Sequence, residues 1–295
     1  MSTSAQQINT ILLVGGTHGN ELTGVRIVEQ WSTVQQQLPT TNIDINTLLA
    51  NPLAVEKRVR FVDDDLNRQF TACNSSPASP SSNEVQLATN YNDMFGVNSA
   101  QQPDLVIDIH NTTSNMGATL ICVSDDPFNQ ALARFVKDQL PAVNVLLENE
   151  KSYAAHPYLC TLGKAGIMLE MGAQPQGVCR ADLMLHSLEL LASIISFCEQ
   201  WNSQTLPSSA ACEVFQFIEN IEFPRDPEGK VNAMIHPQLQ DADFLPLHPG
   251  HAMFTGFDGK VANWQGEETV YPHFINEAAY QRLHVAFATA RKIFW

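Results

Sequence analysis

Two histidines and one glutamate have the types and spacing of a metal site. His18 and Glu21 are three residues apart in the segment GGTHGNE, so that in the first turn of a helix both side chains lie on one side and can share a cation. His110 directly follows residues 104–109 (DLVIDI), a β-branched run that we expect to be a buried central strand. Two neutral imidazoles and one carboxylate, with a fourth position left open, are a ligand set typical of catalytic zinc.

The position of these residues in the predicted sheet favours a metal site over a chance occurrence of these residue types. A histidine three residues before a glutamate is common, and most histidines are surface or hydrogen-bonded residues. The glycine-rich segment lacks both the P-loop lysine and the GxGxxG spacing of phosphate-binding loops. However, His18 follows a strand predicted at 11–14, and His110 follows another. Because ligands in open α/β sheets bind at the carboxyl ends of the strands, we expect these side chains to converge.

The elements that must position the site alternate between strand and helix over the first two thirds of the chain. Apolar residues at helical spacing follow the first strand, and a long helix is predicted over 180–201. Such alternation is typical of a parallel or mixed sheet covered by helices on both faces. The further strands are predicted at 43–49, 104–109, 119–123, 143–147 and 167–170.

The pattern changes after residue 202, where short strand-like runs separated by turn signals follow a polar linker at 204–209. We predict a catalytic domain over residues 1–204 and a smaller β-rich domain over residues 205–295. Residues 74–83 (NSSPASPSSN) are predicted to be a solvated loop of the first domain, with a mobile lid as the alternative.

Composition excludes several classes of protein. Hydrophobic residues make up 44% of the 295 residues, enough for a packed core, and the net charge of −15 argues against nucleic-acid binding. We find no run of about 18 apolar residues and no signal-peptide pattern in the polar segment 1–10, so we expect a cytoplasmic protein that does not span a membrane.

Six widely spaced cysteines without a CxxC pair are predicted to be reduced thiols.

Seven blocks of sequence resemble the aspartoacylase/aminoacylase-3 family, part of the zinc carboxypeptidase-like group, and cover the chain from residue 15 to about residue 280. The resemblance implies a zinc-carboxypeptidase-like α/β fold, with a mixed sheet flanked by helices and a smaller β-rich C-terminal domain that narrows the substrate channel. It also implies one Zn²⁺ per chain and a homodimer or higher homo-oligomer. The blocks are GGTHGNELTG, ANPLAV, DLNR, DIHNTTSNMG, LEMGAQPQG, IHPQLQDADFLPLHPG and VYPHFINEAAY.

The resemblance also implies roles for the residues of the predicted metal site. His18, Glu21 and His110 match the family's zinc ligands. Glu170 matches its general base, which would take a proton from water and pass it to the leaving amine. Glu170 ends a predicted strand, so it should emerge at the same sheet edge as His110. Without the resemblance, a surface carboxylate would be the simpler interpretation.

Arg60, Asn67 and Arg68 match the family's substrate-anchoring residues. Residues 57–68 contain four of the sixteen cations of this acidic chain, which is typical of an anion site, although the aspartates at 63–65 fit a salt-bridged loop equally well. The resemblance implies that Arg60 stabilises the developing oxyanion and that Asn67 and Arg68 hold the α-carboxylate of the substrate.

Residues of the predicted C-terminal domain complete the site. Tyr280 matches a substrate-contacting tyrosine of the family, and is otherwise a half-buried core residue. Glu277, three residues earlier, is predicted to support the site without touching the substrate. His248 and His251 flank Pro249-Gly250, and we expect them to be exposed turn residues and not a second metal site.

The segment 156–164 departs from the family pattern. Members specific for aspartate have an arginine a few residues before Lys164, and Cys160 occupies that position here. About four residues earlier, His156 replaces a tyrosine of the family, unless a shift of the alignment brings Tyr158 to that position. A thiol cannot neutralise the second carboxylate of such a substrate, and an unpaired carboxylate is costly to bury. Either Lys164 binds this group, or dianionic substrates are not preferred.

The sequence thus predicts a zinc-dependent amidohydrolase that deacylates N-acyl amino acids, nominally N-acetyl-L-aspartate, with water to L-aspartate and acetate. The alternatives are a deacetylase of N-acetylated aromatic or neutral amino acids like aminoacylase-3, a succinylglutamate desuccinylase, or a carboxypeptidase. A non-catalytic metal or ligand sensor is the alternative outside enzymes. Glu170 argues against a sensor, because a binding module needs no proton shuttle.

Overall fold

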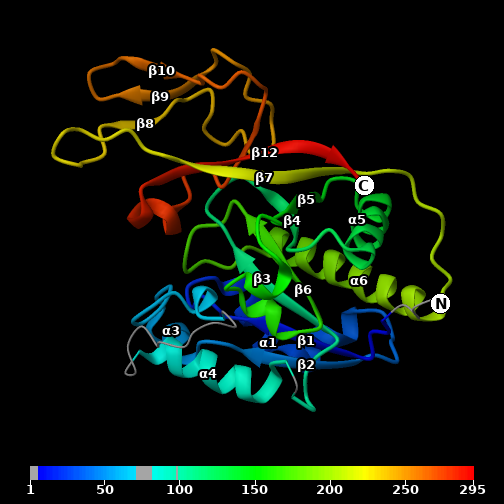
Figure 1. Cartoon of the computed structure of the whole chain (residues 1–295). Helices are drawn as coiled ribbons and strands as arrows, with labels where there is room; N and C mark the ends of the chain where they lie inside the picture. Colours follow the sequence, from blue (N-terminus) through cyan, green and yellow to red (C-terminus); the bar gives the residue numbers. More distant parts are fainter. Residues whose placement is uncertain (1–5, 71–81, 98) are drawn as a thin grey trace.

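The computed structural model describes residues 6–70, 82–97 and 99–295 (Figure 1). Within these ranges a mixed sheet of nine strands forms the centre of the molecule, in the order β11-β12-β7-β5-β4-β6-β3-β1-β2. Its strands are β1 (Thr10–Gly15), β2 (Asp44–Leu49), β3 (Leu105–Asn111), β4 (Gly117–Cys122), β5 (Asn144–Leu147), β6 (Ala165–Gly172), β7 (Glu213–Glu222), β11 (Tyr271–His273) and β12 (Val285–Phe294).

Strands β1, β3 and β6 lie side by side and parallel, so their carboxyl ends meet at one edge. All seven residues of β3 are buried, because it is covered on both faces and paired on both sides. This explains why residues 105–109 of β3 are apolar except for Asp108. The register places His110 beside Glu170 of β6, which brings two of the predicted site residues together.

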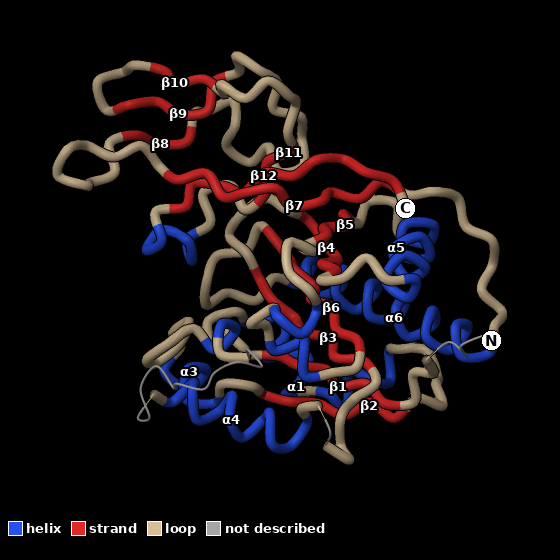
Figure 2. Tube along the Cα trace, viewed as in Figure 1, coloured by secondary structure: helices blue, strands red, loops and turns tan. Residues whose placement is uncertain are grey.

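Helices cover both faces of the sheet, as Figure 2 shows. One face packs against α1 (Leu22–Glu29), α5 (Pro127–Gln139) and α6 (Ala181–Ser203), and the other against α4 (Asn83–Phe95) and the 3-10 turn η4 (Leu159–Leu162). Short helical segments complete the first two thirds of the chain: α2 (Trp31–Val34), η1 (Gln35–Gln37), α3 (Pro52–Lys57), η2 (Leu66–Arg68) and η3 (Tyr153–Ala155). The predicted α/β class is confirmed. The predicted loop 74–83 falls almost wholly outside the described residues, since only its last two residues, at the start of α4, are described.

Helix α6 is long and apolar enough, by length and composition, to cross a membrane, although Asp182, Glu189 and Glu199 interrupt its apolar residues. Nevertheless, α6 packs against β4 and β6, and residues such as Leu190, Ile194 and Phe197 are fully buried in the core beneath the sheet. This burial is typical of a core helix of a folded domain.

The residues after α6 extend the central sheet and also build a second one. Strand β7 pairs in parallel with β5, and β12 and β11 follow it in antiparallel order. A separate sheet of β8 (Ala233–Ile235), β9 (Ala252–Gly256) and β10 (Val261–Asn263) projects from this end, as Figure 2 shows. The predicted β-rich C-terminal region is confirmed. The boundary at residue 204 stays a prediction, because β7 and β12 continue the sheet of the preceding residues.

Two glycines allow α1 to approach the sheet closely. A Cβ atom on Gly15 of β1 would lie 2.2 Å from the Gly24 carbonyl oxygen, and one on Gly24 would lie 2.7 Å from the Ile109 carbonyl oxygen. The helix therefore rests on β1 and β3 without intervening side chains. This contact brings the start of α1 to the carboxyl end of β3, where the Thr23 N–H donates to Asn111 Oδ1 at 3.0 Å.

We expect Gly24→Ala to destabilise the protein by about 2 kcal/mol, because the new methyl group must push α1 away from β3. In an exposed helix the same change would stabilise by about 1 kcal/mol. Urea unfolding measures the difference. Arg26→Ala, on the exposed side of α1, is the matched control and should cost less than about 1 kcal/mol. A Gly24→Ala variant as stable as the parent would contradict the close contact.

Candidate active site

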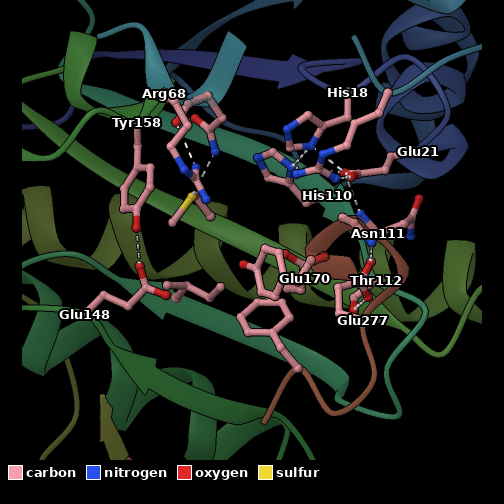
Figure 3. Close-up of a pocket in the computed structure, with 17 residues that line it drawn as sticks. His18, Glu21, Arg68, His110, Asn111, Thr112, Glu148, Tyr158, Glu170 and Glu277 are labelled. Carbon is pink, nitrogen blue, oxygen red and sulfur yellow. Dashed lines mark hydrogen bonds and ion pairs between the residues drawn. The ribbon is translucent and has the colours of Figure 1, made fainter. Parts of the chain in front are cut away.

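His18, Glu21 and His110 converge at the carboxyl ends of β1 and β3, as Figure 3 shows. His18 Nδ1 lies 2.8 Å from Glu21 Oε1, His110 Nδ1 lies 3.0 Å from Glu21 Oε2, and the two Nδ1 atoms are 3.2 Å apart. One ligand atom from each residue fits within 4.8 Å of the others, and all three residues are buried. In the described part of the chain, this is the one group of three such residues with the geometry of a metal site.

The outer nitrogens of both imidazoles face carboxylates. His18 Nε2 lies 3.0 Å from Asp65 Oδ1, and His110 Nε2 lies 2.9 Å from Asp108 Oδ2. When a metal ion is bound, a proton on each Nε2 would leave the Nδ1 lone pair for that ion, and such carboxylates orient metal-bound histidines in proteins. The donor set therefore fits a divalent metal ion.

Asp65 and Asp108 lie beside the candidate metal ligands, and the sequence patterns did not indicate them. In the sequence, Asp65 fits a salt-bridged loop, and Asp108 belongs to an apolar strand. Asp108 is fully buried and accepts a hydrogen bond from Thr17 Oγ1 at 2.8 Å. A charged residue two positions before His110, in an otherwise apolar strand, was the available signal, because a buried charge requires a partner.

Arg60 lies beside the metal ligands. Its guanidinium donates to Glu21 Oε1 at 2.8 Å and to Asp65 Oδ2 at 3.3 Å. Burial opposes ionisation of the Glu21 carboxyl, but the charge of His18 and hydrogen bonds from both histidines hold its pKa well below the ordinary value. The cluster is thus a compact group of alternating charges, in which each ionised group has an opposite partner.

Arg68 and Asn67 lie on the opposite side of the same cavity, as Figure 3 shows for Arg68. The Arg68 guanidinium lies 5.2 Å from the centre of the Tyr158 ring and donates to the Asn67 carbonyl oxygen at 2.9 Å. No carboxylate in the described part of the chain forms an ion pair with it. Asn67 Oδ1 accepts from the Leu159 N–H at 2.8 Å, and its NH₂ group donates to Met168 Sδ at 3.8 Å, so that both ends of the amide are fixed at the cavity wall.

Glu170 projects from β6 into this cavity. It is buried, and burial raises the pKa of its carboxyl well above the ordinary value. A raised pKa suits a group that must accept a proton and release it again. Of the predicted site residues, the cavity is lined by His18, Glu21, Arg60, Asn67, Arg68, His110, Glu170 and Tyr280.

Glu277 joins the C-terminal region to the catalytic cavity. Its carboxylate accepts hydrogen bonds from the Thr113 N–H at 2.7 Å and from Thr113 Oγ1 at 2.9 Å, and it also bonds the hydroxyl of Thr112. These bonds hold the 3-10 turn η5 (Ala278–Leu283) over the loop that follows β3. Tyr280 of η5 thereby becomes part of the cavity wall.

Lys164 lies at the wrong end of the sheet, and its prediction as a substrate-binding residue is wrong. Its ammonium pairs with Asp104 Oδ1 at 2.7 Å, just before β3 begins. Lys164 precedes β6 whereas Glu170 lies near its carboxyl end, and six residues of strand span roughly 20 Å.

Other residues of interest in the sequence also lie outside the cavity. Cys160 is fully buried in the core on the α4 side of the sheet and does not line the cavity. His156 is buried and stacks on the Tyr158 ring, with 5.2 Å between the ring centres. His248 and His251 are exposed in a turn, as expected, and among the described residues they belong to no group of three metal ligands.

Two family models match most of the chain. The succinylglutamate desuccinylase/aspartoacylase catalytic domain matches residues 7–198, and the AstE/AspA barrel-sandwich hybrid domain matches residues 210–292. The chain belongs to the succinylglutamate desuccinylase/aspartoacylase family. This finding confirms the resemblance inferred from the seven sequence blocks.

Relatives and solved structures agree with this assignment. An N-acyl-aromatic-L-amino acid amidohydrolase (carboxylate-forming) from Xenopus laevis is 37% identical over 97% of this chain and 95% of its own length. An aspartoacylase from Danio rerio is 37% identical over 96% of this chain and 92% of its own. The crystal structure of murine aminoacylase 3 covers 99% of this chain and 98% of its own, with a TM-score of 0.89 and 36% identity. A succinylglutamate desuccinylase from Vibrio parahaemolyticus shares the fold, with 16% identity and a TM-score of 0.62.

In this member of the family, the loop that carries Arg60, Asp65 and Arg68 is held by a carboxylate that no sequence pattern indicated. Glu84 of α4 is fully buried and accepts the backbone N–H groups of residues 62, 63 and 64 at 2.7, 3.0 and 3.1 Å. It also accepts from Asn51 Nδ2 at 2.8 Å. Burial opposes its ionisation, but these four donors lower the pKa of the carboxyl.

We expect Glu84→Gln to destabilise the protein by about 1–3 kcal/mol at pH 7, since an amide turns donor hydrogens toward backbone N–H groups. The native pKa of Glu84 lies below the ordinary value of 4.5, so its contribution is present above pH 4.5 and disappears as the pH falls through the lower native pKa. Urea unfolding at pH 7 and in acid compares the two proteins. A difference in stability that does not shrink in acid would argue against the charge as the cause.

Proposed function

We propose that this chain is a metal-dependent amidohydrolase that removes the acyl group from N-acyl amino acids. The observation that carries the proposal is the convergence of His18, Glu21 and His110 in one cavity with a buried glutamate, Glu170. The names of the relatives, which include aspartoacylase and N-acyl-aromatic-L-amino acid amidohydrolase, support an activity on this class of substrate.

We propose Zn²⁺ as the metal, one ion per chain, held by Nδ1 of His18, Nδ1 of His110 and the Glu21 carboxylate. Two imidazoles and a carboxylate are the ligands that zinc takes in many hydrolases. When bound, zinc polarises the scissile carbonyl and makes water more acidic. Asp65 and Asp108 would keep both imidazoles oriented through their outer nitrogens.

The residues of the chain supply the remaining steps. Glu170 accepts a proton from the attacking water, whose oxygen bonds to the acyl carbon, and then gives this proton to the amine nitrogen as the C–N bond breaks. Arg60 donates hydrogen bonds to the oxygen that gains negative charge in the tetrahedral intermediate. Arg68 and the Asn67 amide bind the α-carboxylate, because Arg68 has a guanidinium free of ion pairs with described residues.

The acyl group that we propose is acetyl. N-acetyl-L-aspartate is the nominal substrate from the resemblance, and N-acetylated neutral or aromatic amino acids are the second candidates. The positions of Cys160 in the core and of Lys164 beside Asp104 favour the second group, because neither residue can meet a second carboxylate in the cavity. A cytoplasmic location and a homodimeric or higher assembly stay predictions from the sequence.

We expect removal of the metal with a chelator to lower the rate of N-acyl amino acid hydrolysis at least about 100-fold, and one equivalent of Zn²⁺ per chain to restore it. Elemental analysis and the assay are carried out on the same sample. His110→Ala, which removes one of the three ligands, should bind zinc at least about tenfold more weakly. A rate indifferent to stripping and restoring the metal would refute the proposed mechanism.

We expect Glu170→Gln to lower kcat at least about 1000-fold, because the amide cannot carry the proton from water to the amine. The variant should keep its zinc content and its thermal unfolding temperature, since Glu170 is not one of the three ligands. Glu189→Gln, on the exposed face of α6, is the matched control and should leave kcat unchanged. Near-normal turnover by Glu170→Gln would exclude this role.

A further inference from the structure

A carboxyl group forms part of the cavity wall on the side remote from the metal ligands. Glu148 directly follows β5, and its Oε2 accepts a hydrogen bond from the Tyr158 hydroxyl at 2.8 Å. In Figure 3, Glu148, Tyr158 and Arg68 occupy one side of the cavity, and His18 and Glu21 the other. Nothing in the proposed mechanism uses Glu148.

The catalytic cavity adjoins a second cavity of about 250 Å³ at this wall. Both cavities are lined by Arg68, Glu148, Tyr158, Phe274 and Tyr280. Beyond them, the second cavity is lined by apolar side chains of β7, η5 and β12, together with Asn220, Glu150, Lys151 and His273. The second cavity therefore offers room for a substrate side chain, and the Glu148 carboxyl group lies where it meets the catalytic cavity.

The proposed binding of the α-carboxylate determines which substrate atoms reach this wall. If Arg68 holds that carboxylate, the α-carbon of the substrate lies next to Arg68, which borders both cavities. The side chain of the substrate branches from this α-carbon. The substrate side chain then extends past Glu148 toward the second cavity.

We infer that Glu148 is a specificity-determining residue, which makes the enzyme select N-acyl amino acids whose side chains carry no negative charge. The inference rests on the proposed function and on the proposed role of Arg68. It concerns the choice between substrates and assigns no chemical step to Glu148.

The charges around the cavity support this selection. Arg60 and Arg68 are the arginines among its described lining residues; Arg60 is paired with Glu21 and Asp65, and Arg68 binds the α-carboxylate in the proposed mechanism. A second substrate carboxylate would therefore lie beside Glu148 without a cation of its own. Two carboxyl groups at one partly buried place cannot both be ionised without a penalty.

The surroundings of Glu148 do not remove this penalty. Burial raises the pKa of its carboxyl, and neither ionisation state supplies a positive charge to a second carboxylate. Burial lowers the pKa of His273 to about 4, so this imidazole is neutral at pH 7. Lys151 is exposed at the second cavity, next to the exposed carboxylate of Glu150. A neutral amide or an aromatic side chain meets no such cost.

Two substrates of nearly equal shape test the inference: N-acetyl-L-asparagine and N-acetyl-L-aspartate. We expect the parent enzyme to favour the asparagine derivative in kcat/KM by at least about tenfold, since like charges placed together are strongly unfavourable. Glu148→Gln keeps the shape of the side chain and should reduce this ratio at least about threefold, mainly through a lower KM for the aspartate derivative. Glu148→Ala should shift the ratio in the same direction, and Glu189→Gln is the control that should leave it unchanged.

The outcomes separate this inference from the proposed function. One contrary result is that the parent enzyme hydrolyses both substrates without preferring the asparagine derivative. Another is that both Glu148 variants keep the preference of the parent. Either result would overturn the role of Glu148 and leave the deacylase proposal standing. A zinc-loaded parent enzyme that hydrolyses no N-acyl amino acid, including N-acetylphenylalanine, would refute the proposed function itself. Zinc content and thermal unfolding of each variant show that the altered ratio belongs to a folded, metallated protein.

Discussion

A single buried carboxylate, Glu21, joins the segments from which the site is built. It contacts His18 of the loop after β1, His110 of β3 and the Arg60 guanidinium, and it accepts the Asn111 N–H at 3.1 Å. A charge at such depth is tolerated only when every side of it meets a donor or a cation. The site, the start of α1 and the end of β3 are therefore parts of one electrostatic unit.

Other buried carboxylates extend the same principle to the walls of the cavity. Glu84 gathers the backbone N–H groups of the loop that presents Arg60 and Arg68, and Glu277 fastens the C-terminal region to the loop after β3. Each holds its loop by several directed hydrogen bonds, which fix a loop in one position more closely than apolar packing does. The C-terminal strands thus shape the cavity as well as lengthening the sheet.

Much of the catalytic cluster could be predicted from the sequence, because it depends on strand order and direction. Residues that follow parallel strands emerge at one sheet edge, so the sequence places His18, His110 and Glu170 at that edge. The observed order β6-β3-β1 makes them neighbours. Lys164 shows the limit of nearness in sequence. It lies six residues from Glu170 but at the other end of the same strand, paired with Asp104.

The sequence by itself determined the alternation of strands and helices, the β-rich end of the chain and the residue types of the metal cluster, because these follow from local periodicity and spacing. Only the tertiary structure decided which carboxylates face the outer nitrogens of the histidines, which glutamate holds the loop 60–68, and that Glu148 meets the cavity near Arg68. The contact between His18 and Asp65, for example, joins residues 47 positions apart. The geometry of such contacts depends on how whole elements pack, which no local pattern encodes.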